Sequence, residues 1–226
     1  MRRVIVVFFL LLVSLNGANL KYVIDGGIFG TLANIDIDYH VGKSSYSVAV
    51  EIRLAGLAKL KAKRIIDHRV SKGFIKNGKY YSQYYKVEKR YRDNKKVQRV
   101  YSFNYRKKVV TKHYTVWQNG KKLIDTKTKL PYFSTNDLLN LYHNIVNYSR
   151  IGKNGTYYMT AVGAENDGGK VKFSISPKKI KMHINNSNFS KGKGVLTFDI
   201  DSSGIANLGT VDGIRILGSA KLKQIK

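Results

Sequence analysis

The stretch that decides the fold is SYSVAVEIRL, which runs from Ser45 to Leu54. Every second residue from Tyr46 onward is apolar, and the residues between them are small or charged. Because successive side chains of a β-strand point to opposite faces, this stretch predicts a strand with one buried and one solvated face. Antiparallel sheets tolerate a solvated face, whereas parallel sheets covered by helices rarely alternate so cleanly.

The same alternation recurs along the chain and is punctuated by turn signals. Asn and Gly tolerate the positive φ angles that tight hairpin turns require, and Asn-Gly or Asp-Gly pairs separate several of the alternating runs. The sequence therefore predicts a mainly β fold, with a single antiparallel, curved or barrel-like meander sheet. Further alternating runs lie at 35–41, 170–175, 196–201 and 214–223, and the turn signals at 25–27, 77–78, 119–120, 154–155, 167–169 and 212–213.

One segment has helical spacing instead. Ser134 or Thr135 can cap a helix, and Asp137 favours its positive end. We expect one amphipathic helix from about Thr135 to Tyr148, packed on the sheet through its apolar stripe. A shorter stretch, Ala55–Lys63, fits either a helical turn or a continued strand, because periodicity does not distinguish them at that length. The stripe consists of Leu138, Leu141, Tyr142, Ile145 and Val146.

The amino terminus has the three parts of a secretory signal peptide. Arg2 and Arg3 are followed by the uncharged apolar run Val4–Val13 and then by a small, polar stretch that ends at Ala18. An apolar run of about 10 residues is too short to cross a membrane, which takes about 20. We predict cleavage after Ala18 and export to the periplasm. An uncleaved anchor or a buried amino-terminal strand is the alternative.

Composition bounds the mature chain. Removal of residues 1–18 would leave 19–226, a length that fits a single β-rich domain. The chain has no cysteine, which excludes disulfides, lipid attachment through a Cys and thiolate chemistry. Its 41 Lys and Arg against 14 Asp and Glu give a formal net charge of +27. A partner of opposite charge is therefore plausible.

The charge is concentrated in one third of the chain, between Lys59 and Lys129. That segment holds 23 basic and 4 acidic side chains, and eight of the sixteen tyrosines. Lys and Arg can neutralise the anionic groups of an envelope surface, and tyrosines suit an interface that is wet at one end. We predict that an anionic partner contacts Lys89, Arg90, Arg92, Lys95, Lys96 and Arg99. We predict an aromatic interface at Tyr81, Tyr85, Tyr101 and Tyr105.

Short motifs occur in a fixed order between about Tyr22 and Lys223. They are GIFG at 27–30, AGLA at 55–58, DHRVSKG at 67–73, NDLLNLY at 136–142, IDSSG at 200–204 and GSAKL at 218–222. In order and spacing this set resembles the exported bacterial family catalogued as domain of unknown function three-one-zero-eight. The resemblance implies an envelope protein rich in β structure, and it supplies no activity and no catalytic residues. Members often have a proline after the Ser-x-Gly stretch, whereas Phe74–Asn77 contains none.

The sequence offers no enzyme chemistry, so we predict a non-enzymatic protein without cofactor or metal. The five histidines are scattered with no ligand spacing, and no Gly-x-Ser-x-Gly elbow presents a nucleophile. Asp67 and His68 are adjacent in a strand-like run, so their side chains should point to opposite faces, and we expect them to be solvated. Two pairs of alternating acids, Asp36 with Asp38 and Asp199 with Asp201, fit the wet face of a strand. We expect Tyr142 and His143 at boundary or core positions.

The favoured function is a binding or structural β domain whose basic, Tyr-rich face contacts anionic envelope lipid, lipopolysaccharide or wall polymer, with peripheral membrane contact possible. The simplest alternative is that solvated strands merely carry their charge outward. Nucleic acid binding fits the composition, but export argues against it as the native role.

A different class would use the inside of the sheet. A periplasmic lipid or glycolipid carrier could enclose an apolar groove, although the same apolar faces could form a packed core. An outer-membrane barrel fits poorly, because the strands between Lys76 and Lys122 are rich in lysine.

Overall fold

The computed structural model describes residues 18–150, 154–164, 168–185, 193–200, 206–214 and 218–225. Fourteen strands form one antiparallel sheet in the order β8-β7-β6-β5-β4-β3-β2-β1-β14-β13-β12-β11-β10-β9. The front half comprises β1 (Ala18–Asp25), β2 (Thr31–Val41), β3 (Ser45–Leu54), β4 (Arg64–Lys76), β5 (Lys79–Tyr91), β6 (Lys95–Asn104), β7 (Val109–Gln118) and β8 (Lys121–Lys129). The back half comprises β9 (Gly155–Thr160), β10 (Lys170–Ser176), β11 (Lys179–Asn185), β12 (Lys193–Ile200), β13 (Ala206–Ile214) and β14 (Gly218–Ile225).

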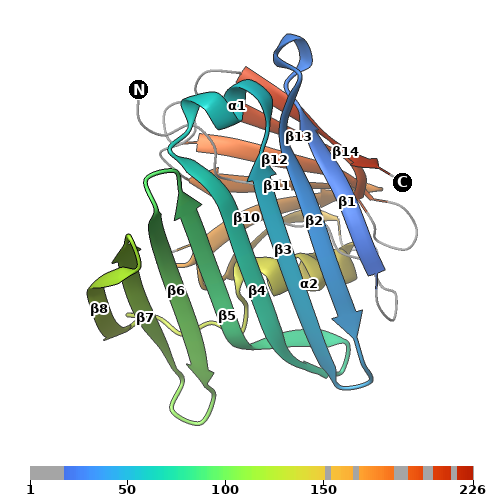
Figure 1. Ribbon diagram of the computed structural model, residues 1–226. Helices are drawn as coiled ribbons and strands as arrows, with labels where there is room; N and C mark the ends of the chain where they lie inside the picture. Colours follow the sequence, from blue (N-terminus) through green and yellow to red (C-terminus); the bar gives the residue numbers. More distant parts are fainter. Residues whose placement is uncertain are drawn as a thin grey trace.

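The sheet turns back on itself where β1 pairs with β14, so that the two halves face each other (Figure 1). The mainly β meander predicted from the sequence is therefore confirmed. Strands β8 and β9 are the two ends of the order, which makes this an open sheet. The predicted signal peptide lies outside the described residues, apart from Ala18 at the start of β1.

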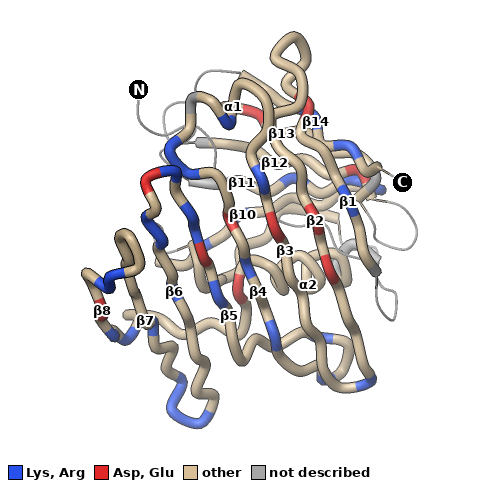
Figure 2. Tube along the Cα trace, in the orientation of Figure 1, with Lys and Arg blue, Asp and Glu red and all other residues tan. Residues whose placement is uncertain are grey.

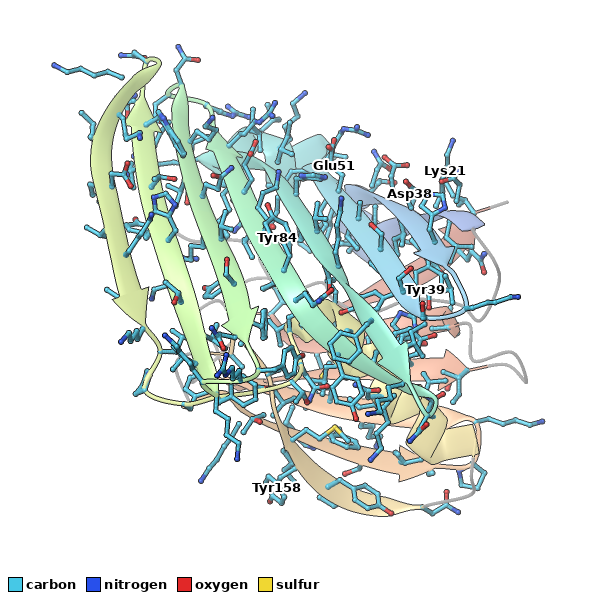
Figure 3. The ribbon with its side chains drawn as sticks, turned by 90° about the horizontal axis from the view of Figure 1, so that it is seen from below. Lys21, Asp38, Tyr39, Glu51, Tyr84 and Tyr158 are labelled. Atoms are coloured by element: carbon cyan, nitrogen blue, oxygen red, sulfur yellow. The ribbon has the colours of Figure 1, made fainter. Side chains whose placement is uncertain are left out.

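The longest helix, α2 (Leu138–Arg150), lies between the two halves and contacts β4, β5 and β10 (Figures 1 and 3). A six-residue helix, α1 (Gly56–Lys61), follows β3. The stretch Ala55–Lys63, for which periodicity allowed a helical turn or a continued strand, therefore contains a helix. A short 3-10 turn, Gly27–Phe29, follows β1. No helix in the described ranges is long and apolar enough to cross a membrane.

Strand β3 has the bounds predicted from its alternation, Ser45–Leu54. Asn77 and Gly78, with φ of 51° and 70°, connect β4 to β5, and Asn119 and Gly120, with φ of 50° and 78°, connect β7 to β8. Positive φ at both central residues is the type I′ geometry that suits the twist of a hairpin. These Asn-Gly signals therefore mark two hairpins, and β4 runs up to the first of them without a proline.

One predicted run was wrong. The alternation over 214–223 predicts one strand, but β13 ends at Ile214 and β14 begins at Gly218. The predicted turn residues Asp212 and Gly213 lie inside β13, where the register with β14 shifts between Asp212 and Ile214. A bulge therefore stands where the Asp-Gly signal predicted a turn, because an Asp-Gly pair also suits an irregularity within a strand.

The core lies between the two halves and around α2. Tyr22 and Tyr39 from the front half, Tyr142 from α2, and Phe173 and Phe198 from the back half are fully buried. Figure 3 shows Tyr39 on the side of α2, whereas Asp38 and Glu51 lie on the opposite side. The alternation of β2 and β3 thus separates a packed inner face from a solvated outer face.

Candidate functional site

Charge is unevenly distributed over the front half. Residues 18–54, which form β1 to β3, carry three basic and four acidic side chains, a net charge of −1. Residues 79–129, which form β5 to β8, carry sixteen basic and three acidic side chains, a net charge of +13. Figure 2 shows acidic positions on β2 and β3 and basic positions gathered on β5 to β8 and their turns. We call β5 to β8 the basic wing.

Part of this positive charge lies on the inner face of the sheet. Asp67 and Arg69 of β4 are 3% and 5% exposed. Lys89 of β5 is paired with Asp67, and Val87 is paired with both Arg69 and Arg99 of β6. Residues opposite each other in an antiparallel pair point to the same face, so these side chains share the inner face. We call Arg64, Asp67, Arg69, Lys89 and Arg99 the inner cluster.

Asp67 anchors the inner cluster. Its two carboxylate oxygens accept hydrogen bonds from Arg69 Nε at 2.7 Å and Nη2 at 3.1 Å, and Arg64 Nη1 lies 3.4 Å away. Burial disfavours the charged carboxylate, but the neighbouring Arg69 and Arg64 outweigh it and hold the pKa of Asp67 well below its ordinary value. The expectation that Asp67 is solvated was therefore wrong, whereas its placement opposite to His68 was right. The period of two shows that neighbouring residues lie on opposite faces of the strand, but it does not show which face is buried.

Lys89 is a strongly perturbed cation of the cluster. Burial is the main cause that lowers its pKa to about 7, and Arg69, Arg64 and Arg99 add to the shift, while Asp67 opposes it. The ammonium of Lys89 is therefore only partly protonated at neutral pH. The described structure holds more positive charge around Lys89 than Asp67 compensates.

Tyrosines surround these cations. The buried rings of Tyr85 and Tyr101 stack with centroids 5.6 Å apart, and Arg69 Nη1 donates to the Tyr85 hydroxyl at 3.4 Å. Burial raises the pKa of Tyr85 far above its ordinary value, so the phenol stays neutral. The guanidinium of Arg99 lies 5.5 Å from the ring centre of Tyr114 on β7. The inner cluster is thus bounded by aromatic faces and neutral hydroxyl groups.

The predicted binding residues do not share one face. Lys89 and Arg99 lie on the inner face, whereas Arg90 pairs with Glu88 at 2.9 Å, and Lys96 lies 4.1 Å above the Trp117 ring. Arg92 bonds the carbonyl of Lys59, and Lys95 is only partly exposed. The period of two separates neighbours such as Lys89 and Arg90, so a run of basic residues in a strand is divided between its faces.

The predicted aromatic residues divide in the same way. Tyr85 and Tyr101 are buried beside the inner cluster. Tyr81 instead stacks on Phe74 with centroids 5.0 Å apart, and the Tyr105 ring packs edge-on against Phe133. The structure therefore brings Lys89, Arg99, Tyr85 and Tyr101 together.

A second polar cluster, at the start of α2, was missed by the sequence analysis. Asp137 is fully buried, and its Oδ2 accepts hydrogen bonds from Ser71 Oγ at 2.5 Å and Ser82 Oγ at 2.6 Å. Its Oδ1 accepts the backbone N–H groups of Leu139 and Asn140 at 2.7 and 3.1 Å. Asp137 therefore caps the helix, and not Ser134 or Thr135 as predicted.

Both carboxylate oxygens of Asp137 are used by hydrogen bonds within the protein, so this cluster has a structural role. Burial raises the pKa of Asp137, while its four hydrogen bonds act in the opposite direction. Tyr46 extends the network, since its hydroxyl lies 3.0 Å from Ser71 Oγ. A signal was present in the sequence: Ser71 and Ser82 are polar positions on inward strand faces. The cluster joins the amino-terminal end of α2 to β4 and β5.

The remaining polar expectations concern the histidines and acids. Tyr142 and His143 are buried, as predicted, and the His143 ring stacks between Tyr39 and Tyr80. Asp36 lies on the wet face of β2, where Arg53 Nη1 is 2.6 Å away. In the described ranges no group of three or more His, Asp and Glu residues is placed to hold a metal ion.

Comparisons with known proteins bear on the fold. The chain is similar to the crystal structure of a beta-barrel-like protein of domain of unknown function DUF1849 from Brucella abortus, with a TM-score of 0.54 and 10% sequence identity. The alignment covers 95% of this chain and 98% of that chain. No family profile and no curated protein matches the sequence. At this identity the likeness shows the fold, and the described structure is accordingly a beta-barrel-like, open antiparallel sheet.

Proposed function

We propose that this is an exported, non-enzymatic binding protein of the cell envelope, and that its basic wing contacts an anionic envelope component. The observation that carries the proposal is the separation of charge within one sheet, from −1 over residues 18–54 to +13 over residues 79–129. A concentrated field attracts an anionic surface and orients the protein on it. Lipid head groups, lipopolysaccharide and anionic wall polymer share the required charge.

The cations next to the turn between β5 and β6 supply the first contacts. Arg90 and Arg92 are exposed, and Lys95 and Lys96 are partly exposed, so all four can reach a surface from β5, β6 and the turn between them. Each basic residue near an anionic surface contributes about 1 kcal/mol, and the attraction falls within a Debye length. Export and membership of family three-one-zero-eight are part of the proposal and rest on the amino-terminal pattern and the motif order.

A vesicle assay tests the proposal with a matched control. The mature chain should sediment with phosphatidylglycerol vesicles at low salt, remain in solution with phosphatidylcholine, and dissociate steeply as salt rises. Neutralising Arg90, Arg92, Lys95 and Lys96 to Gln should remove most of this binding. The control neutralises four exposed lysines of the back half, Lys170, Lys172, Lys178 and Lys181, and so has the same net charge.

The control quadruple variant should keep binding at close to the wild-type level. Equal losses in the two variants would mean that net charge, and not the basic wing, governs association. Unchanged binding in both would remove the proposal.

The alternative, a lipid or glycolipid carrier, needs an apolar groove between the two halves. The buried rings of Tyr22, Tyr39, Tyr142, Phe173 and Phe198 instead occupy that region, which favours a packed core. Native mass spectrometry of the protein isolated from its own envelope distinguishes the two functions. A bound lipid of defined mass would support the carrier, and a bare chain would support the binding surface.

A further inference from the structure

The inner cluster holds four cations, Arg64, Arg69, Lys89 and Arg99, and one carboxylate, Asp67. Asp67 is its carboxylate, and both of its oxygens are occupied by Arg69 and Arg64. Within the described part of the chain, Lys89 and Arg99 form no ion pair with a carboxylate. Buried or half-buried charges are costly unless an opposite charge compensates them. The charge of the cluster is therefore not fully compensated by Asp67, and an anion at Lys89 and Arg99 would compensate it.

We infer that the inner cluster binds a phosphomonoester group, with Lys89 and Arg99 as its principal contacts. This inference rests on the proposed function, since it names the anionic group that the basic wing would bind on its inner face. Val87 separates Arg69 from Arg99 across β5, and Lys89 is the next inward residue along that strand. An anion above Val87 would be approached by Lys89 from its own strand and by Arg99 from β6.

Charge and shape select the ligand class. A phosphomonoester carries a charge of about −1.5 to −2 at neutral pH, whereas a carboxylate or a phosphodiester carries about −1. Lys89 and Arg99, which form no ion pair with Asp67, match the larger charge. The planar guanidinium of Arg99 offers parallel N–H groups to two phosphate oxygens, and Lys89 adds a point charge. Lys89, Arg99 and Tyr114 are partly exposed, so a ligand can reach them.

Binding should be coupled to protonation of Lys89. The charged groups that act on its ammonium are Asp67, Arg69 and Arg64 from β4 and Arg99 from β6. An anion beside it favours the charged form, so a ligand bound near neutral pH would draw a proton onto Lys89. Affinity should therefore be higher at pH 6 than at pH 8, where Lys89 is mostly neutral and must be protonated on binding.

Titration calorimetry with glucose 1-phosphate tests the inference on the mature chain. Lys89→Gln and Arg99→Gln should each lose about ten-fold or more in affinity, since each removes a charged hydrogen bond. The matched controls are Lys86→Gln on the outer side of β5 and Lys172→Gln on β10, which each remove one positive charge outside the inner cluster and should change affinity by less than about two-fold. Equal losses in all four variants, or no binding of glucose 1-phosphate by the wild type, would overturn the inference.

Two further readouts separate the site from a general effect of charge. Repeating the titration at pH 7.5 in buffers of different ionisation enthalpy should show proton uptake in the wild type that is absent in Lys89→Gln. Removing this desolvated cation from beside three arginines should not lower the melting temperature, so the variant remains folded. Proton uptake that is equal in the two proteins would contradict the role of Lys89.

The source of the phosphate is resolved with vesicles. Phosphatidic acid presents a phosphomonoester and phosphatidylglycerol a phosphodiester. A preference for phosphatidic acid that is lost in Lys89→Gln would identify a lipid head group as the source. Binding of glucose 1-phosphate without that preference would identify a soluble phosphate. The inference can fail while the proposed function stands. That is the result if the quadruple variant of Arg90, Arg92, Lys95 and Lys96 loses vesicle binding and glucose 1-phosphate does not bind.

Discussion

Strands β1 to β3 and the basic wing belong to one sheet and share one alternation, yet their inner faces differ in kind. On β2 and β3 the inward positions are apolar throughout, as at Ile35, Ile37, Val48 and Val50, and all four are buried. On the strands that follow, the corresponding inward positions include Arg69, Lys89 and Arg99. Hydrophobic burial is sufficient to explain the first region. In the second, hydrophobic burial does not explain the inward cations. Asp67 compensates Arg69, and the binding role proposed above accounts for Lys89 and Arg99.

The largest expected effect contrasts two Asp–Arg pairs of nearly equal length. Asp67→Asn removes the carboxylate that compensates Arg69 and Arg64, and should lower the free energy of unfolding by about 3–5 kcal/mol. Asp36→Asn breaks the exposed pair with Arg53 and should cost about 1 kcal/mol or less. Urea denaturation of both variants measures the difference. Similar losses in the two would show that the inner cluster is no more protected from water than the outer face of β2.

The next effect concerns how α2 is attached beside the wing. Asp137→Ala removes the helix cap and leaves the hydroxyls of Ser71 and Ser82 without their acceptor. Losing a cap costs about 1 kcal/mol and a buried unsatisfied group about 1–3, so we expect a loss of about 2–4 kcal/mol in unfolding free energy. Ser134→Ala, at a position predicted as the cap, should cost less. The order of the two losses, measured by thermal and urea unfolding, decides which residue caps the helix.

A smaller effect is expected in how the unfolding free energy changes as pH falls. The pKa of Asp67 is lowered in the folded protein, so the stability that it contributes is present above its unfolded pKa and is lost as pH falls. Between about pH 4 and pH 2 the wild type should therefore lose more unfolding free energy than Asp67→Asn. Parallel pH profiles for the two proteins would show that Asp67 is not ionised in an ion pair.

The smallest effect lies on the outer side of the wing. Arg90→Gln breaks an ion pair with Glu88 in which the Arg90 side chain is 61% exposed. The expected change in unfolding free energy is about 1 kcal/mol or less, because such pairs are screened by water and salt. The same substitution belongs to the set that should weaken vesicle binding. Arg90→Gln should therefore contribute to the loss of vesicle binding while leaving stability nearly unchanged. A large loss of stability would show that Arg90 has a structural role instead.

The class of fold and several of its elements could be predicted because they depend on local rules. Alternation gave the bounds of β3, and the Asn-Gly pairs marked two hairpins. Local rules failed where the same residue pair is compatible with two backbone conformations. Asp212-Gly213 suits a turn or a bulge, and only the pairing of β13 with β14 decides for the bulge.

The candidate site was predictable only in part. The basic and aromatic content of the segment drew attention to Lys89, Arg99, Tyr85 and Tyr101, which do lie together. Their location on the inner face depends on which side α2 and the back half cover, and the sequence of the strand does not contain that information. Asp67 was expected in solvent for the same reason. Arg69 is two residues from Asp67 on the same strand face, so alternation alone could have paired them, whereas Asp137 is 66 residues from Ser71 and 55 from Ser82.

The central prediction is that an anionic surface contacts the sheet at β5 to β8. Amide chemical shifts of the isotope-labelled mature chain, recorded with and without small phosphatidylglycerol bicelles at low salt, answer this strand by strand. We predict shifts and line broadening in β5 to β8, and in particular at Arg90, Lys95 and Lys96, with β1 to β3 unchanged and the effect reversed by salt. Perturbations centred on β1 to β3, or spread evenly over the sheet, would contradict the account.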